Sequence, residues 1–210
     1  MNLPTREECF ELLKEYHVPE NVVAHCEKVA KVAVFLAEKL KEKGADVNIE
    51  LVEGASLLHD LVRICDIVEF DKSNFKKNGL DITDDEFIEM KKIRKKFIGK
   101  HHADSCHDIL IEEYPELALV IKRHRFRYIL NKDHKPETWE QKLVFYADKR
   151  VKHDKIVSLK ERFEDGRKRN AHLLSKASNK REQEEKQIFA LEKEIFNKIG
   201  LEPNSLNALN

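Results

Sequence analysis

The sequence predicts an all-α fold. Apolar residues recur at three- and four-residue spacing along most of the chain, strand-like alternation is hard to find, and only six glycines and five prolines interrupt the 210 residues. The hydrophobic content of 41% suffices for a core, whereas the charged content of 37% predicts densely charged exposed faces. This length suits one domain with an appendage. We therefore expect a helical bundle over residues 1–155 and a C-terminal helical extension over residues 156–210, which packs on the domain or on a partner.

Capping signals and glycines place the individual helices. Three residue pairs have the spacing of capping boxes and so predict helix starts: Thr5 with Glu8, Thr83 with Glu86, and Thr138 with Gln141. Gly44, Gly99 and Gly200 follow apolar-periodic stretches and predict helix ends. The expected helices cover residues 5–16, 22–43, 48–64, 83–97, 103–113, 115–123 and 138–151. Residues 66–80 and 130–137 are expected to form loops.

The chain changes character after residue 160. Residues 160–169 are nearly all charged, and residues 178–198 keep a thin apolar stripe made of Ile188, Leu191, Ile195 and Phe196. Such a stripe predicts a helix that buries only a narrow face. That face can pack against the domain, or it can serve dimerisation or bind a partner helix, so a homodimer is one expected alternative.

Charge and cysteine usage exclude several classes of protein. The formal net charge is zero and the pI is about 7.2, which argues against a general attraction to nucleic acid or to an anionic membrane. The four cysteines form no CxxC pair and indicate reduced thiols. The N-terminus lacks a signal-peptide pattern, and no stretch approaches the ~18 uninterrupted apolar residues of a transmembrane helix. We expect a cytoplasmic protein with neither a membrane nor a nucleic-acid partner.

The dipeptide His59-Asp60 is the strongest indication of a functional site. It ends an apolar run, and a buried carboxylate is costly unless something such as a divalent cation neutralises it. Four further residues also lie on or beside apolar stripes: His25, His102, His124 and Asp148. Each has an ordinary explanation when taken alone, such as a satisfied core histidine or a surface carboxylate paired with a neighbouring cation. Their joint occurrence over about 120 residues favours a metal site.

The order of these residues resembles the HD-domain superfamily of metal-dependent phosphohydrolases. The resemblance covers about residues 20 to 152. Four segments carry it: Val23-Ala24-His25-Cys26-Glu27-Lys28-Val29-Ala30, Gly54-Ala55-Ser56-Leu57-Leu58-His59-Asp60, His102-Ala103-Asp104-Ser105-Cys106-His107-Asp108-Ile109-Leu110, and Leu143-Val144-Phe145-Tyr146-Ala147-Asp148-Lys149. It implies an HD-domain-like helical bundle with the metal site in its core, followed by the charged C-terminal helices.

The resemblance also implies a ligand set. A first metal would be held by His25, His59, Asp60 and Asp148, and Asp60 would bridge to a second metal held by His102 and His124. One or two divalent ions are therefore expected, among Mn, Fe, Co, Ni, Zn and Mg, because mixed imidazole and carboxylate ligands do not choose among them. Asp60 and His59 are the expected catalytic residues. His101 and His102 are adjacent, and a shift of one residue would exchange their roles.

The reaction implied by the resemblance is hydrolysis of a phosphate ester or anhydride by a metal-activated water. The expected substrate is a nucleotide or a related small phosphorylated compound. Four basic side chains near the proposed ligands are the expected phosphate contacts: Arg63, Arg123, Arg125 and Lys149. Many family members read His-Asp-Ile-Gly-Lys where this chain reads His59-Asp60-Leu61-Val62-Arg63. Arginine contacts phosphate bidentately whereas lysine acts as a point charge, so this departure affects the substrate contact rather than the metal ligands.

Three other interpretations stay open at this point. A few relatives of this fold use two irons for oxygenation, and the ligand set admits that chemistry. A non-enzymatic, metal-stabilised helical binding domain is favoured somewhat by the long charged C-terminal segment. Finally, His102 and Cys106 are four residues apart on one helical face, which admits a thiol site.

Overall fold

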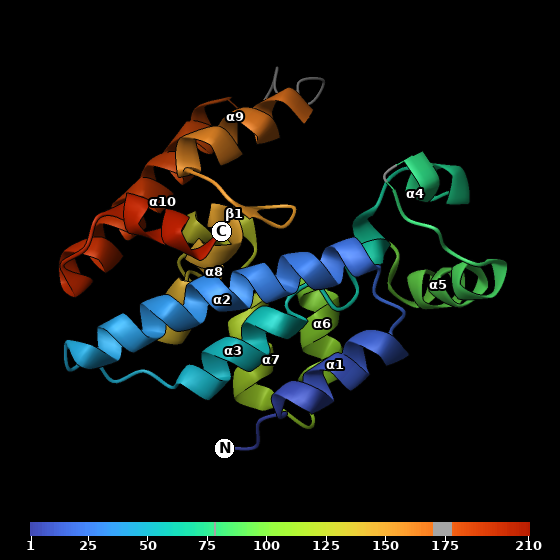
Figure 1. The fold of residues 1–210 in the computed structure, drawn as a ribbon, viewed down its shortest axis with the longest axis horizontal. Helices are drawn as coiled ribbons and strands as arrows, with labels where there is room; N and C mark the ends of the chain where they lie inside the picture. Colours follow the sequence, from blue (N-terminus) through green and yellow to red (C-terminus); the bar gives the residue numbers. More distant parts are fainter. Residues whose placement is uncertain (78, 170–177) are drawn as a thin grey trace.

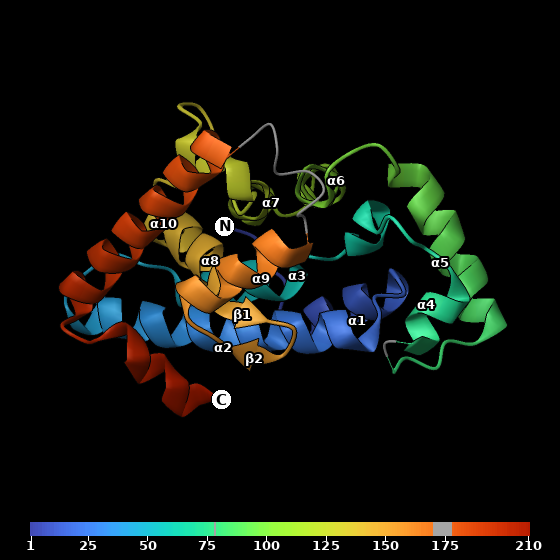
Figure 2. The same ribbon diagram turned by 90° about the horizontal axis from the view of Figure 1, so that it is seen from above.

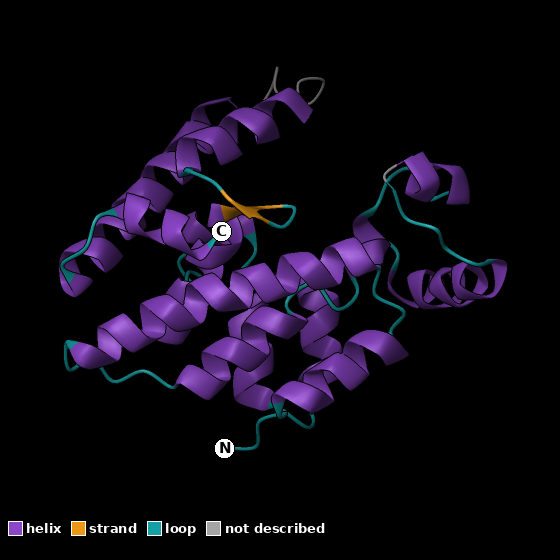
Figure 3. Ribbon diagram, viewed as in Figure 1, coloured by secondary structure: helices purple, strands orange, loops and turns teal. Residues whose placement is uncertain are grey.

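A computed structural model describes residues 1–77, 79–169 and 178–210 of the chain. Helices make up nearly all of these residues, which confirms the predicted all-α class (Figure 3). The α-helices are α1 (Arg6–Glu15), α2 (Glu20–Glu42), α3 (Ile49–Leu58), α4 (Lys72–Lys77), α5 (Asp84–Phe97), α6 (His102–Leu110), α7 (Pro115–Lys122), α8 (Trp139–Arg150), α9 (Leu159–Arg169) and α10 (Ser178–Ile199). Short 3-10 helices are η1 (Arg63–Asp66), η2 (Phe126–Leu130) and η4 (Pro203–Leu209). None of the described helices is long and apolar enough to cross a membrane.

Helix α3 lies at the centre of the bundle, between α2, α7 and α8 (Figure 1). Its residues from Leu51 to Leu58 are buried apart from the half-buried Glu53. Gly54 lets α3 pack close to α7, because a Cβ there would lie 3.0 Å from the Leu117 Cδ1 atom. Since α3 is packed on several sides, the residues that follow it are delivered into the interior of the protein.

All three predicted capping boxes are present. The Thr5, Thr83 and Thr138 side chains each accept a hydrogen bond from the backbone N–H three residues later, and the side chain at that position returns a bond to the cap. These reciprocal bonds satisfy donors that a helix start otherwise leaves without partners. The box at Thr138 fixes the start of α8, which carries Asp148 near its other end.

Two local expectations were wrong, and one element was not predicted. The central helix ends at Leu58 rather than near residue 64, so His59 and Asp60 lie in the turn that precedes η1. The expected loop at 66–80 contains α4, which buries Phe75 in a small second cluster. Finally, β1 (Val151–Lys152) and β2 (Lys155–Ile156) form an antiparallel hairpin in which His153, at φ 56°, makes the tight turn.

The C-terminal helices α9 and α10 pack against the rest of the bundle (Figure 2). The predicted apolar stripe is confirmed, because Ile188, Leu191, Ile195 and Phe196 are all buried and belong to the same hydrophobic cluster as α2, α3 and α8. Helices α4 and α5 lie at the opposite end of the molecule from α10. The C-terminal segment therefore shares a core with the preceding helices.

Candidate metal centre

The six predicted ligands converge although they come from five separate parts of the chain. His25 belongs to α2, and His59 and Asp60 form the turn after α3. His102 begins α6, His124 follows α7, and Asp148 lies near the end of α8. The packing of α3 explains this arrangement. Its C-terminal end, at Leu58, lies among α2, α7 and α8, so the residues that follow it face ligands from those helices. His59 is fully buried, and the other five line a cavity of about 390 Å³.

His25, His59 and Asp148 form the first group of ligand atoms, which lie within 4.8 Å of one another. The Asp148 Oδ1 atom is 3.2 Å from His25 Nε2 and 3.8 Å from His59 Nε2. In both His25 and His59, a backbone carbonyl orients the imidazole through the Nδ1 atom, on the side away from Asp148. The His25 Nδ1–H donates to the His153 carbonyl at 2.8 Å, and the His59 Nδ1–H donates to the Ser56 carbonyl at 2.7 Å. The hairpin that the sequence did not predict thus orients one proposed ligand.

Asp60, His102 and His124 form the second group, also within 4.8 Å. His102 Nε2 lies 3.1 Å from Asp60 Oδ1 and 3.0 Å from His124 Nε2. The other Asp60 oxygen, Oδ2, lies 3.7 Å from His59 Nε2. The Asp60 carboxylate therefore stands between the two groups, with one oxygen toward each. The His124 Nδ1–H donates to the Ile121 carbonyl at 2.5 Å.

A carboxylate that the sequence analysis missed holds His102. The Asp66 Oδ2 atom lies 2.5 Å from His102 Nδ1 and 3.1 Å from Arg63 Nη1. Arg63 Nη1 lies 2.8 Å from the same His102 Nδ1 atom, so Asp66 and Arg63 together hold this edge of the ring, and Nε2 faces Asp60 and His124. Asp66 stands in a segment with no apolar periodicity or motif of its own, and its role depends on the packing of η1 against α6.

The residues fit a divalent metal. In all four rings Nδ1 contacts a carbonyl or a carboxylate, so each Nε2 faces the interior of the cluster. His59 Nε2 is buried with no hydrogen-bond partner among the described residues. His102 and His124 bring their Nε2 atoms to 3.0 Å from each other, so both rings could hold the same cation.

The electrostatics of the centre favour ionised carboxylates. Burial raises the pKa of Asp60, but the charges of His59, His102 and Arg63 outweigh it and hold that pKa far below its usual range. Burial also opposes ionisation of Asp148, where the Lys149 charge and the His25 hydrogen bond keep the pKa well below normal. Burial, followed by the neighbouring His59 and His102, lowers the pKa of His124 well below its usual value. The centre thus offers carboxylates and neutral imidazole to a cation.

His25 is the exception among the imidazoles. Burial lowers its pKa, but the hydrogen bond and the charge of Asp148 outweigh burial and shift the pKa upward. A proton and a metal therefore compete for the same Nε2 atom, as is general for histidine ligands.

The structure brings His102, rather than His101, beside Asp60 and His124. His101 is the N-cap of α6, where its Nδ1 atom accepts a hydrogen bond from the Ala103 N–H at 3.2 Å. Burial and the adjacent His102 lower the His101 pKa to about 3, so this ring stays neutral. His101 forms a third group of possible ligand atoms with Asp66 and His102, again within 4.8 Å of one another.

The four expected phosphate contacts divide into two kinds. Arg63, Arg125 and Lys149 line the cavity. Lys149 is buried there, and its ammonium donates to Asp148 Oδ2 at 2.6 Å and to the His124 carbonyl at 2.7 Å, so it positions ligands. Arg123 does not reach the cavity lining. Its guanidinium donates to Glu137 and Gln141 at 2.7 and 3.0 Å, which ties it to the start of α8.

The thiol interpretation of Cys106 was wrong. The side chain is fully buried, and its Sγ–H donates to the His59 carbonyl at 3.6 Å. Burial raises the pKa of this thiol far above its ordinary value, so no thiolate is available as a nucleophile.

The family assignment agrees with this geometry. The sequence pattern of the HD domain family matches residues 22–151, and the chain belongs to that family. The resemblance seen in the sequence is thereby confirmed, and it places the chain in a superfamily of metal-dependent hydrolases, whose HD domains bind divalent metals. All six candidate ligands fall within the matched residues, whereas α9 and α10 lie outside them.

Two curated relatives are similar over much of this chain. A tRNA (cytidine(56)-2'-O)-methyltransferase of Picrophilus torridus is 27% identical over 172 residues, which is 81% of this chain and 43% of that protein. An uncharacterised protein of Methanocaldococcus jannaschii is 29% identical over 154 residues, which is 66% of this chain and 74% of that protein. The chain therefore spans less than half of the methyltransferase. No solved structure matches the chain.

Removal of Asp66 tests how the second ligand group is held. We expect Asp66→Ala to weaken metal binding by roughly 10- to 100-fold, because His102 loses a partner that orients its ring. Competition against a fluorescent chelator measures this affinity. Glu69→Ala, an equal charge change on an exposed residue of the same segment, is the matched control and should leave the affinity unchanged. Equal affinities for the two variants would contradict the role given to Asp66.

Proposed function

We propose that the protein is a metal-dependent phosphohydrolase that cleaves a phosphate ester or anhydride bond of a nucleotide. The convergence of four inward-directed Nε2 atoms with two carboxylates, each ring fixed through Nδ1, is the observation that carries the proposal. His25, His59 and Asp148 would hold one ion, and His102 and His124 a second. Asp60, which directs one oxygen to each group, would bridge them. Divalent ions at these positions supply an activated water and polarise a phosphoryl oxygen.

The surrounding residues have separable tasks in this proposal. Lys149 and Asp66 hold ligands in place, as their hydrogen bonds to Asp148 and His102 indicate. Arg63 and Arg125 line the cavity and would balance the negative charge that develops on the phosphoryl oxygens. His59 has Nδ1 occupied by the Ser56 carbonyl and Nε2 directed at the cluster, which suits a ligand. Asp60 keeps further lone pairs that can accept a hydrogen bond from the attacking water and so orient it.

We do not extend the methyltransferase activity named for the Picrophilus torridus relative to this chain. The matched part is 43% of that protein, and the site found here consists of metal-ligand chemistry rather than of a methyl-donor pocket. The proposed substrate remains a small phosphorylated compound.

The test begins with protein purified without chelator. We expect about one or two transition-metal ions per chain by elemental analysis, and release of phosphate from at least one member of a nucleotide panel. A chelator should stop turnover and added Mn²⁺ should restore it. Bound metal with oxygen consumption and no phosphate release would instead favour the di-iron oxygenase. Bound metal with neither activity would favour the non-enzymatic binding domain, and no bound metal would contradict the site itself.

A further inference from the structure

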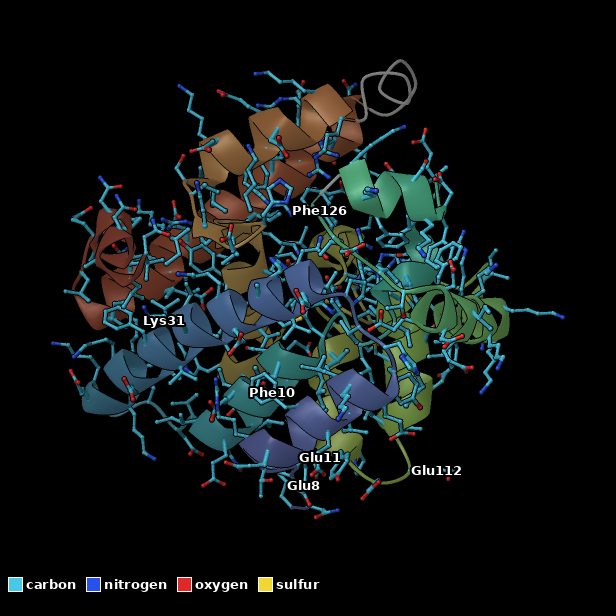
Figure 4. The ribbon with its side chains drawn as sticks, turned by 45° about the vertical axis from the view of Figure 1, so that its right-hand side comes forward. Glu8, Phe10, Glu11, Lys31, Glu112 and Phe126 are labelled. Atoms are coloured by element: carbon cyan, nitrogen blue, oxygen red, sulfur yellow. The ribbon has the colours of Figure 1, made fainter. Side chains whose placement is uncertain are left out.

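The C-terminal helices complete the cavity that holds the metal ligands. Arg162 and Arg169 of α9 and Arg181 of α10 line it together with the candidate ligands. Phe126 of η2, labelled in Figure 4 below the α9–α10 pair, belongs to the same lining. These arginines lie outside residues 22–151, so the family assignment gives them no role.

The cavity carries more positive than negative charge. Seven lysine or arginine side chains line it, against the three carboxylates Asp60, Asp148 and Asp165. Two of those carboxylates are candidate metal ligands. Asp165 is shared between Lys152 at 3.2 Å and Arg169 at 2.8 Å. With divalent metal bound at the ligands, the excess of positive charge in the cavity would be larger still.

Arg162 is the clearest unsatisfied group in this wall. Its Nε atom is buried and has no hydrogen-bond partner among the residues that the structure describes. A half-buried cation in this state lacks both water and a counter-charge on its buried side. An anionic ligand in the cavity would supply the missing acceptor.

Arg181 is held in place before any ligand arrives. Its Nε–H donates to Glu185 at 3.1 Å, and its guanidinium stacks over the Phe126 ring at 5.2 Å from the centroid. Gly166 of α9 makes room for it, because a Cβ at that position would lie 2.9 Å from the Arg181 Nη2 atom. The close approach of α9 to this guanidinium thus places a rigid, planar donor at the cavity.

We propose that Arg162, Arg169 and Arg181 form a second phosphate subsite, so that the preferred substrates are nucleotides with two or more phosphates. This inference rests on the proposed phosphohydrolase function. The reacting phosphate lies at the metal ligands, and a further phosphate of the same molecule contacts the α9–α10 arginines. Guanidinium groups bind phosphate oxygens bidentately, which suits this wall. A nucleoside monophosphate would contact only the metal ligands, because it has no further phosphate for the α9–α10 arginines. The Arg162 charge would then stay uncompensated.

The test compares two double variants of α9. Arg162→Gln with Arg169→Gln removes two charges from the cavity lining, whereas Lys160→Gln with Lys168→Gln removes two charges of the same helix that lie outside that lining. In the parent, we expect kcat/KM to be higher for a nucleoside triphosphate than for the monophosphate of the same base. The arginine variant should lose roughly 10- to 100-fold in kcat/KM for the triphosphate, mainly through KM, and less than about twofold for p-nitrophenyl phosphate. The lysine variant should match the parent.

A binding measurement separates this inference from the proposed function. Titration of the metal-loaded full chain with inorganic triphosphate reports the subsite without turnover. If no substrate is hydrolysed but the arginine variant alone binds triphosphate more weakly, the subsite stands and the phosphohydrolase proposal fails. If hydrolysis occurs and both double variants bind and turn over the triphosphate equally well, the subsite is overturned and the phosphohydrolase proposal stands.

Discussion

Replacement of Asp60 with asparagine is expected to lower kcat by roughly 10³-fold and to remove at least one bound metal ion per chain. The Asp60 carboxylate directs one oxygen toward each ligand group, 3.1 Å from His102 Nε2 and 3.7 Å from His59 Nε2. The amide keeps the shape of the side chain but removes the negative charge and turns one acceptor into a donor. That donor would point at imidazole nitrogens that need to face a cation.

Metal content and thermal stability check this expectation independently of any substrate. Metal that binds only the folded state raises the melting temperature, so the parent should gain stability on titration with Mn²⁺ and the Asp60→Asn variant should gain much less. Asp108→Asn, which neutralises a carboxylate of α6 that pairs with Lys100 outside the cavity lining, is the matched control. Unchanged metal content and turnover in the Asp60 variant would remove the basis for the bridging role.

Local sequence patterns were sufficient to predict the all-α class and the starts of three helices. The capping boxes at Thr5, Thr83 and Thr138 work through neighbours three residues away, so their prediction needs no tertiary information. The end of α3 was misplaced because the apolar residues Leu61, Val62 and Ile64 continue a helical pattern beyond His59. Their burial has another cause, since they pack in the turn and in η1 after the helix has ended.

The candidate ligands could be predicted because each stands out against an apolar stripe. The groups that hold or surround them could not, because their roles arise from contacts across the chain. Asp66 is recognisable only when η1 meets α6, and the His153 carbonyl only when the hairpin meets α2. The position of Arg123 also depends on contacts across the chain. Its position next to His124 in sequence suggested a phosphate contact, whereas the side chain turns toward Glu137 and Gln141.

The second large effect is expected on stability, at a buried ion pair between α8 and α10. Arg150 is 1% exposed, and its Nη1 group donates to Glu192 Oε2 at 3.1 Å and to the Tyr146 hydroxyl. The Nε–H donates to the Val157 carbonyl at 2.7 Å, and Nη2 donates to the Pro203 carbonyl at 3.2 Å. The pair therefore connects the helix that carries Asp148 with three segments that follow it.

Glu192→Ala should lower the free energy of unfolding by about 3–5 kcal/mol, because it leaves the buried Arg150 charge without its counter-ion. Urea denaturation of the metal-free protein measures this loss without a contribution from bound metal.

Glu194→Ala removes a carboxylate two residues further along α10 that pairs with Lys142 at the surface, and it should cost about 0–1 kcal/mol. Glu192→Gln keeps an acceptor for Arg150 and should fall between the two. A cost for Glu192→Ala no larger than that of the surface control would show that α10 is not anchored through Arg150. The position of α10, and with it that of Arg181 at the cavity, would then depend on the apolar stripe rather than on this ion pair.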